Sequence, residues 1–168
     1  MLFAIRLLTL CCLLLLPWTA QAQFFSSSSS SEFLPVDQAF HPSAWQDNDS
    51  LYIGIDNADG YYLYRHRFSV DAADASVRLG APQLPPGEAK TDEFLGDVHV
   101  FYDQVVFEVP LDAAPDGPID IALTFQGCAD AGLCYPPETV SLTAAPSSPP
   151  AVFAEAAAAL QPGDGDGA

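Results

Sequence analysis

Along much of the chain, apolar residues alternate with polar or small ones, and this period of two limits the fold more than any other feature. In residues 119–125, every second residue is large and apolar. Such spacing puts the apolar side chains on one face of a β-strand. Comparable patterns predict further strands at Leu51–Ile55, Tyr61–Val70, Ser76–Leu79, Val98–Val109 and Thr139–Thr143. Because no stretch between residues 33 and 143 sustains a helical period of 3.6, the sequence predicts an all-β domain.

Turn signals divide these strands into short pieces. The alternation within Val98–Val109 changes phase, which predicts a tight turn or bulge near Asp103. The tetrapeptide Asn57-Ala58-Asp59-Gly60 is typical of a hairpin connection. Short strands with frequent turns favour a β-sandwich, although a small barrel has the same periodicity.

The first 22 residues have the pattern of a secretory signal peptide. Arg6 precedes an apolar run from Leu7 to Leu16, and Ala20-Gln21-Ala22 predicts cleavage after Ala22. The run is too short to span a bilayer, which needs about 20 apolar residues. We therefore expect an exported chain with no membrane span after cleavage.

The composition of the flanking segments predicts the domain boundaries. Residues 23–32 form a Ser-rich lead-in with six consecutive serines. Residues 144–168 are rich in Ala, Pro and Gly and form an acidic tail or linker, in which Val152 to Leu160 has the composition of a short helix. The folded domain is expected at residues 33–143, which is enough chain for one modest core.

Acidic residues dominate the charge of the chain. It has 22 Asp and Glu residues against 5 Lys and Arg residues, and its formal net charge is −17. So few cations cannot form the basic patch that phosphate contacts require, which excludes nucleic-acid binding of that kind. The same excess argues against docking to anionic lipid. We interpret it as a solvated surface with no catalytic role.

Two cysteines carry most of the functional signal. Cleavage of the signal peptide removes Cys11 and Cys12 and leaves Cys128 and Cys134, which are spaced C-x5-C. Asp130 and Gly132 between them favour a turn that brings the two sulfurs together. In an exported domain, where disulfides persist, a structural disulfide is the ordinary interpretation of such a pair.

Two other interpretations compete with a structural bridge. A metal site would need more ligands, and the available histidines, His41, His66 and His99, are distant in sequence. A redox-active disulfide is the other. The C-x5-C bridge closes so short a loop that it removes little entropy from the unfolded chain, which weakens its value as a staple. An accessible bridge of this kind suits thiol–disulfide exchange.

The residues around the cysteines resemble a known family. The run from Gln126 to Pro137 is similar to the active-site segment of the N-terminal periplasmic domain of the thiol:disulfide interchange protein DsbD. Three further stretches fit the same family in the same order: Phe33–Phe40, Asp59–Arg65, and Asp92-Glu93-Phe94 followed by Gly96. The resemblance covers about residues 33–143.

This resemblance implies an immunoglobulin-like β-sandwich with one redox-active disulfide between Cys128 and Cys134. It assigns mixed disulfides with partners to Cys134 and makes Cys128 the resolving cysteine. The other residues that it assigns to the site are Phe94, Asp92 and Glu93 on a loop that caps the disulfide, and Tyr62 and Tyr64 close to the pair.

The residues alone permit plainer interpretations. Phe94 is a lone aromatic in the acidic loop from Gly87 to Asp97, where it could fill the edge of the core. Asp92 and Glu93 would then be solvated charges, and the tyrosines would belong to the core or its rim. If the two acids lie beside Cys134, they raise its thiol pKa, so the reduced domain would react slowly until a partner docks.

The family resemblance also implies partners and an activity. The activity is protein-disulfide reduction with no dissociable cofactor and no metal. Electrons would pass to thioredoxin-fold proteins of the periplasm, such as disulfide isomerases and the cytochrome c maturation thioredoxin. The family's membrane core and thioredoxin-like domain have no counterpart in residues 1–168, so we expect a separate membrane or thioredoxin-like electron donor. The alternative is a non-catalytic immunoglobulin-like binding module with a structural disulfide.

Overall fold

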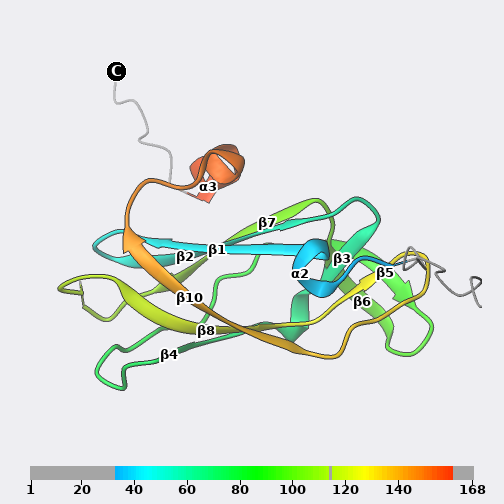
Figure 1. Ribbon diagram of the computed structural model, residues 1–168, viewed down its shortest axis with the longest axis horizontal. Coiled ribbons are helices and arrows are strands. Elements are labelled where there is room, and N and C mark those ends of the chain that lie inside the picture. Colours follow the sequence, from blue (N-terminus) through cyan, green and yellow to red (C-terminus); the bar gives the residue numbers. More distant parts are fainter. Residues whose placement is uncertain (1–32, 114, 161–168) are drawn as a thin grey trace, which may run out of the picture. The chain divides into compact units, whose positions relative to one another are not determined.

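The computed structural model of the protein describes residues 33–113 and 115–160 (Figure 1). The predicted signal peptide at 1–22 and the Ser-rich lead-in at 23–32 lie outside the described residues. The described chain begins with a short helix, α2 (Val36–Ala39), and its strands then form two sheets. None of the helices described is long and apolar enough to cross a membrane.

The larger sheet has six strands in the order β4-β8-β10-β1-β2-β7. These strands are β1 (Phe40–Gln46), β2 (Ser50–Asn57), β4 (Ser69–Ala72), β7 (Gln104–Pro110), β8 (Ile119–Phe125) and β10 (Glu138–Pro146). Strands β1 and β10 are parallel, and the other neighbours in this sheet are antiparallel.

The smaller sheet has four antiparallel strands in the order β5-β6-β3-β9. They are β3 (Tyr61–Tyr64), β5 (Glu88–Asp92), β6 (Gly96–Phe101) and β9 (Gly127–Ala129). One core cluster joins the sheets, with Phe40, Ile55 and Phe125 from the larger and Leu63 and Phe101 from the smaller. The predicted all-β sandwich is confirmed.

The chain passes between the sheets at several places where one strand closely follows another, and two of these connections are very short. Strand β8 leads into β9 through Gln126, and β6 leads into β7 through a turn at Asp103. Asp103 has a φ of 52°, a left-handed conformation that suits a tight turn. The predicted change of phase near Asp103 is therefore confirmed, and it marks a change of sheet.

The single strand predicted at Tyr61–Val70 is wrong. A 3₁₀ turn, η1 (Arg65–Arg67), separates β3 in the smaller sheet from β4 in the larger one. Beyond the turn, the ring of Phe68 packs 5.3 Å from that of Phe107 in the core. Apolar residues alternate with polar ones in the strands of both sheets. The period of two therefore continues across the 3₁₀ turn, and the sequence pattern does not reveal where one strand ends and the other begins.

The hairpin predicted at Asn57–Gly60 is also wrong. The segment does turn, with Gly60 at a φ of 80°, but it joins β2 of the larger sheet to β3 of the smaller. The buried Asn57 side chain donates from Nδ2 to the carbonyl oxygen of Phe101 at 3.0 Å. This hydrogen bond ties the connection to the smaller sheet, where a hairpin would have continued the larger one.

The remaining differences between the predicted and observed strands fall where apolar and polar residues alternate only weakly. Residues Ser76–Leu79 form no strand, and Leu79 makes an isolated bridge to Leu111. The alternation also fails to predict β1, β5 and β9. In β1, His41 and Pro42 interrupt the pattern, and β5 lies at the edge of its sheet with an exposed or half-buried residue at every position.

The segment after residue 143, expected to be a tail, differs from that expectation. Strand β10 runs to Pro146, and η2 (Ala151–Phe153) and α3 (Ala154–Leu160) cover the outer face of the larger sheet (Figure 1). The Phe153 ring is 1% exposed and stacks 5.8 Å from Trp45. It lies over Gly54, where a Cβ atom would come within 2.8 Å of it. The folded unit therefore continues through α3.

We predict that Phe153→Ala lowers the free energy of unfolding by about 3 kcal/mol, because it removes a buried aromatic ring and leaves a cavity. Val152→Ala is the matched control, since Val152 is 50% exposed, and it should change stability little. Urea unfolding monitored by the fluorescence of Trp45 measures both. Equal stabilities of the two variants would show that the segment contributes nothing to the fold.

Candidate functional site

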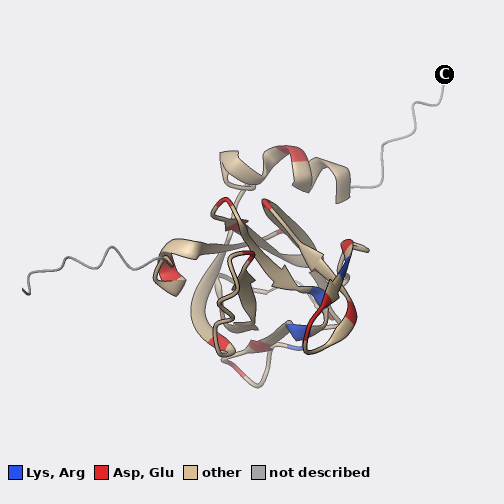
Figure 2. Ribbon diagram, turned by 90° about the vertical axis from the view of Figure 1, so that its right-hand side faces the viewer, with Lys and Arg blue, Asp and Glu red and all other residues tan. Residues whose placement is uncertain are grey.

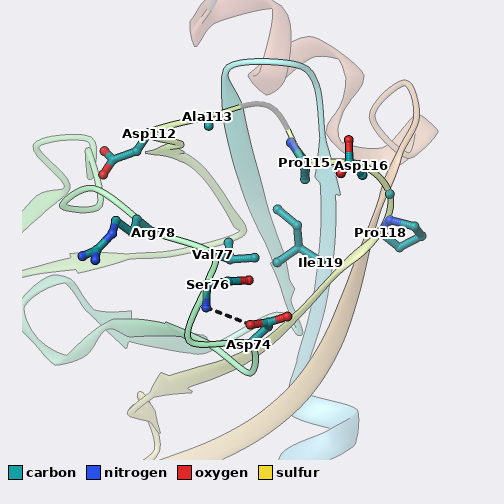
Figure 3. Close-up of a pocket in the computed structure, with 11 residues that line it drawn as sticks. Asp74, Ser76, Val77, Arg78, Asp112, Ala113, Pro115, Asp116, Pro118 and Ile119 are labelled. Atoms are coloured by element: carbon teal, nitrogen blue, oxygen red, sulfur yellow. Dashed lines mark hydrogen bonds between the residues drawn. The ribbon is translucent and has the colours of Figure 1, made fainter.

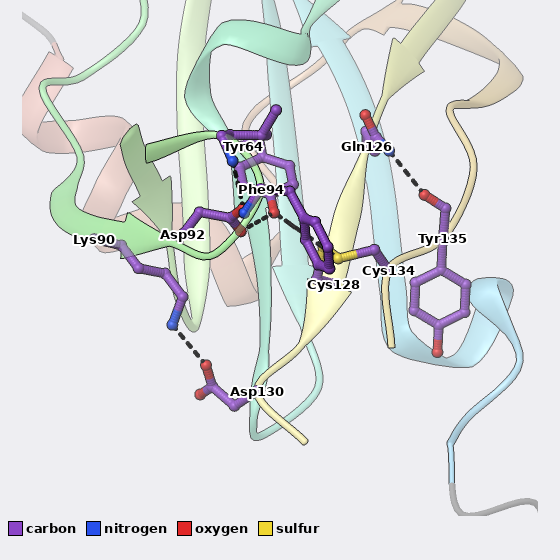
Figure 4. The surroundings of a disulfide bond; sticks show 10 residues. Tyr64, Lys90, Asp92, Phe94, Gln126, Cys128, Asp130, Cys134 and Tyr135 are labelled. Carbon is purple, nitrogen blue, oxygen red and sulfur yellow. Dashed lines mark hydrogen bonds and ion pairs between the residues drawn. A yellow bond between two sulfur atoms is a disulfide. The ribbon is translucent and has the colours of Figure 1, made fainter. Parts of the chain in front are cut away.

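The disulfide lies at the edge of the smaller sheet (Figure 4). Cys128 is the central residue of β9, and the chain turns back so that Cys134 lies opposite it, with the Cα atoms 4.0 Å apart. Gly132 makes the turn possible with a φ of 104°, and its N–H donates to the carbonyl oxygen of Ala129 at 2.9 Å. The predicted C-x5-C disulfide is confirmed.

The two sulfurs have very different surroundings. Cys128 is 0% exposed and packs in a cluster with Tyr62, Tyr64, Val98 and Val100. Cys134 is exposed. An incoming thiolate must approach a disulfide sulfur directly, so Cys134 presents the open sulfur and Cys128 the protected one.

Gly127 fixes the depth of the buried cysteine. A Cβ atom at this position would overlap the ring of Phe40 and come within 2.6 Å of the carbonyl oxygen of Tyr62. The backbone of β9 therefore lies in close contact with both β3 and the main core. Only glycine fits here, because there is no room for a Cβ atom. The close packing of Gly127 also places the neighbouring Cys128 in the interior.

Tyr64 connects the disulfide to an acid. Its hydroxyl donates to Oδ2 of Asp92 at 2.6 Å and lies 3.3 Å from Sγ of Cys128 and 3.8 Å from Sγ of Cys134. Disulfide sulfurs carry no proton, so the hydroxyl proton points to the carboxylate and the sulfurs face the hydroxyl oxygen. Burial and the Asp92 carboxylate both raise the pKa of Tyr64, which keeps the hydroxyl protonated.

Asp92 also organises the segment that carries Phe94. Its Oδ1 accepts the backbone N–H groups of Phe94 at 2.8 Å and Leu95 at 2.9 Å. The hydrogen bond from Tyr64 and then these two N–H groups lower the pKa of Asp92. The segment expected as a loop from Gly87 to Asp97 is a hairpin of β5 and β6, here called the cap hairpin (residues 88–101), and Asp92 holds its turn.

Phe94 does not fill the core. It is 86% exposed, so its interpretation as a core residue is wrong. It lines a surface depression together with Glu93, Asp92 and Cys134, and Figure 4 shows it in front of the disulfide. The ring therefore stands beside the exposed sulfur without being packed against the domain.

Tyr62 lies within the same cluster as the disulfide. It is 4% exposed, and its ring meets that of Tyr64 edge to face at 5.5 Å. It also lines the depression that holds Cys134. The structure thus brings both tyrosines and the cap residues to the cysteine pair.

Sequence reasoning missed a charged group at this site. Nζ of Lys90 lies 3.0 Å from Oδ1 of Asp130 and donates to the Tyr102 hydroxyl at 2.8 Å. It also sits 4.5 Å above the centre of the Tyr62 ring. Figure 4 shows Lys90 reaching from the cap hairpin to Asp130 in the loop closed by the disulfide, here called the disulfide loop (residues 128–134). The sequence feature that could have drawn attention to Lys90 is that it is the only lysine in the chain.

Tyr135, also missed, anchors the far side of the disulfide loop. Its hydroxyl donates to the carbonyl oxygen of Leu34 at 2.5 Å, while the N–H of Leu34 donates to the Tyr61 hydroxyl at 2.8 Å. Burial, followed by the contact with Tyr61, raises the pKa of Tyr135 to about 12. The start of the described chain therefore braces the loop that presents Cys134.

A separate depression shares no residue with this site (Figure 3). It lies between the segment around Val77 and the loop that precedes Ile119, and the carboxylate of Asp74 accepts the N–H of Ser76 there at 2.8 Å. Within the described ranges, no group of three His, Cys, Asp or Glu side chains is placed to hold a metal ion.

Fold and site together define an all-β sandwich domain with one disulfide, half buried and half exposed, at the edge of its smaller sheet. The family model for the N-terminal part of the thiol:disulfide interchange protein DsbD matches residues 30–146. The chain belongs to this family of DsbD N-terminal domains.

Curated relatives agree with this membership. The chain is 46% identical over 144 residues to thiol:disulfide interchange protein DsbD 1 of Pseudomonas aeruginosa, an alignment that covers 80% of this chain and 24% of the relative. It is 40% identical over 144 residues to DsbD of Yersinia pestis, covering 82% and 24%. The chain thus spans about a quarter of the length of these relatives.

Solved structures show the same fold. The reduced DsbD N-terminal domain of Neisseria meningitidis has a TM-score of 0.63 and 33% identity, over 70% of this chain and 94% of that one. The complex of the DsbD and PilB N-terminal domains from the same organism gives a TM-score of 0.58 and 34% identity, over 67% and 87%.

The lowered pKa of Asp92 predicts acid sensitivity of the site. The charged carboxylate stabilises the folded state above its ordinary pKa of about 4, and that contribution is lost as pH falls through the lower folded value. Wild type should therefore exceed Asp92→Asn in stability near neutral pH, and the difference should shrink below about pH 4. Urea unfolding of both proteins between pH 2 and 7 measures this, with Glu93→Gln as control for loss of one charge. A difference that is constant with pH would contradict it.

Proposed function

We propose that this domain is a protein-disulfide reductase of the periplasm, which relays reducing equivalents through Cys128 and Cys134. The observation that carries the proposal is the contrast between the two sulfurs, one 0% exposed and the other open to solvent, in a member of the DsbD N-terminal family. A bridge that served only as a staple would need no open sulfur beside a depression.

Loading of the domain begins with a thiolate of the electron donor. It attacks Sγ of Cys134, the Cys128–Cys134 bond breaks, and Cys128 leaves with the electron pair as a thiolate. The donor's second thiolate then attacks the donor sulfur of the mixed disulfide. The donor becomes oxidised, and Cys134 is released reduced, so that two electrons now reside on the pair.

In the second half of the cycle, the reduced cysteine pair passes its two electrons to an acceptor protein. The Cys134 thiolate attacks a disulfide of the acceptor and forms a mixed disulfide. The Cys128 thiolate then attacks Sγ of Cys134, which releases the acceptor as a dithiol and forms the Cys128–Cys134 bond again. No dissociable cofactor takes part, because the two sulfurs carry both electrons.

Tyr64 and Asp92 make this chemistry depend on the cap hairpin. With the cap in place, the Tyr64 proton bonds to Asp92 at 2.6 Å. A docking partner that displaces the cap withdraws Asp92 and frees that proton for the nearby Cys128 thiolate, whose sulfur lies 3.3 Å from the hydroxyl in the disulfide form. The leaving group is then stabilised only when a partner is present.

The cellular setting is part of the same proposal. The chain is exported, its signal peptide is cleaved after Ala22, and the domain works in the periplasm with a separate membrane or thioredoxin-like electron donor. Its acceptors are thioredoxin-fold proteins such as disulfide isomerases or the cytochrome c maturation thioredoxin. The neisserial complex of a DsbD N-terminal domain with the PilB N-terminal domain supports docking to another protein domain.

Trapping experiments test the roles of the two cysteines. Cys128→Ala should accumulate mixed disulfides with periplasmic proteins, because Cys134 can attack but nothing resolves the product. Cys134→Ala should accumulate few, because its remaining thiol is buried. Non-reducing gels with mass spectrometry of the adducts measure this in the oxidising periplasm. Equal trapping by both variants, or none by either, would overturn the assignment.

Phe94→Ala tests the cap. Removing the ring should speed reduction of the disulfide by glutathione roughly two- to tenfold, because a ring that is 86% exposed buries little surface and opens at small cost. Stability in urea should be nearly unchanged. Leu95→Ala is the matched control, since this neighbouring side chain does not line the depression with Cys134. Equal rates for wild type and both variants would rule out shielding by Phe94.

A further inference from the structure

One cation joins two separate parts of the site. Lys90 belongs to β5, at one edge of the smaller sheet, whereas Asp130 directly follows β9, at the opposite edge. The Lys90 side chain crosses the outer face of the sheet over the Tyr62 ring and meets Asp130 at 3.0 Å. An ion pair therefore links the cap hairpin to the disulfide loop, the seven residues from Cys128 to Cys134.

Other contacts hold this ion pair in place. The Tyr102 hydroxyl accepts from Lys90 at 2.8 Å and donates to the same oxygen of Asp130 at 2.9 Å. The backbone N–H of Asp130 donates to the carbonyl oxygen of Gly60 at 2.8 Å. The Lys90 side chain is 28% exposed and that of Asp130 is 45% exposed. The contact is thus ordered, yet open enough for dissolved salt to weaken it.

The charge of the chain makes this cation unusual. The sequence has 5 Lys and Arg residues against 22 Asp and Glu, and Lys90 is its only lysine. Figure 2 shows acidic positions on strands and loops throughout the ribbon, against few basic ones. A lone ammonium group held beside a cysteine depression that also contains Asp92 and Glu93 is poorly explained as a solubilising charge.

We propose that Lys90 is a positioning residue for the exchange reaction: it latches the cap hairpin to the disulfide loop through Asp130 and so limits access to Sγ of Cys134. The proposal rests on the proposed function. The cap hairpin is then held by two contacts: the hydrogen bond between Asp92 and Tyr64, and the ion pair between Lys90 and Asp130. A partner that presents a carboxylate or a carbonyl oxygen to Lys90 would release it, so the latch favours protein partners over small thiols.

The first test is the rate at which an uncharged reductant, tris(hydroxypropyl)phosphine, reduces the disulfide of the exported chain. Lys90→Met keeps an unbranched apolar side chain of nearly the same length and removes the charge. It should speed reduction roughly three- to tenfold, the size expected for one networked ion pair with a cation–π contact. Lys90→Arg should restore a rate near that of wild type. Arg78→Met, which removes a cation that lines the separate depression, controls for net charge.

The dependence of the reduction rate on salt concentration distinguishes an ionic latch from a merely structural role of Lys90. The wild-type rate should rise between low salt and about 0.5 M salt, where the Debye length is only a few ångströms, while the Lys90→Met rate stays flat. Asp130→Asn should reproduce the Lys90→Met behaviour, and the double variant should be no faster than either single one. Asp130→Asn also serves if Lys90→Met fails to fold.

The outcomes are distinct. Equal rates and equal salt dependence for wild type, Lys90→Met and Asp130→Asn would overturn the latch, even if wild type exchanges normally with partners. Additive effects in the double variant would likewise overturn it. A failure of the proposed function would appear differently, as an absence of mixed disulfides with any partner from a chain whose reduction by the phosphine still responds to Lys90.

Discussion

The close contact between Gly127, the Phe40 ring and the carbonyl oxygen of Tyr62 is the constraint on which the site depends. It allows the chain to leave β8 in the larger sheet and pair as β9 with β3 in the smaller one. Because β9 is drawn against the core, Cys128 is buried, and the short return leaves Cys134 at the surface. The difference between the two sulfurs therefore follows from backbone packing in the core.

In the mechanism that we propose, the cap hairpin converts this difference in exposure into control over the reactivity of the disulfide. Asp92 binds the turn that carries Phe94 and also holds the Tyr64 hydroxyl close to the sulfurs. Lys90, two residues earlier on the same strand, holds the disulfide loop. Strand β5, at the edge of the sheet, thus contacts both the Tyr64 hydroxyl beside Cys128 and Asp130 in the span that ends at Cys134. We propose that a docked partner that moves β5 changes both contacts at once and that a small thiol does not.

Much of this arrangement follows from local sequence patterns, and the rest does not. Strand β8 and the turn at Asp103 are visible because alternation and its change of phase are local. The sheet to which a strand belongs is not local, so Tyr61–Val70 is predicted as one strand although Tyr62 lies in the smaller sheet and Val70 in the larger. The disulfide follows from its spacing, and the cap residues from family resemblance. The Lys90–Asp130 contact joins residues 40 positions apart, and no periodicity predicts it.

The central claim is that the Cys128–Cys134 disulfide is built to be exchanged, and its reduction potential tests this most directly. The chain would be equilibrated with glutathione or dithiothreitol buffers at pH 7, quenched by alkylation, and its free thiols counted by mass. Structural bridges in exported proteins usually have potentials below about −300 mV, where the glutathione pool cannot reduce them. We predict a potential well above that value, within the range of exchange proteins. A potential below about −300 mV would show that the bridge is a staple and would contradict the relay.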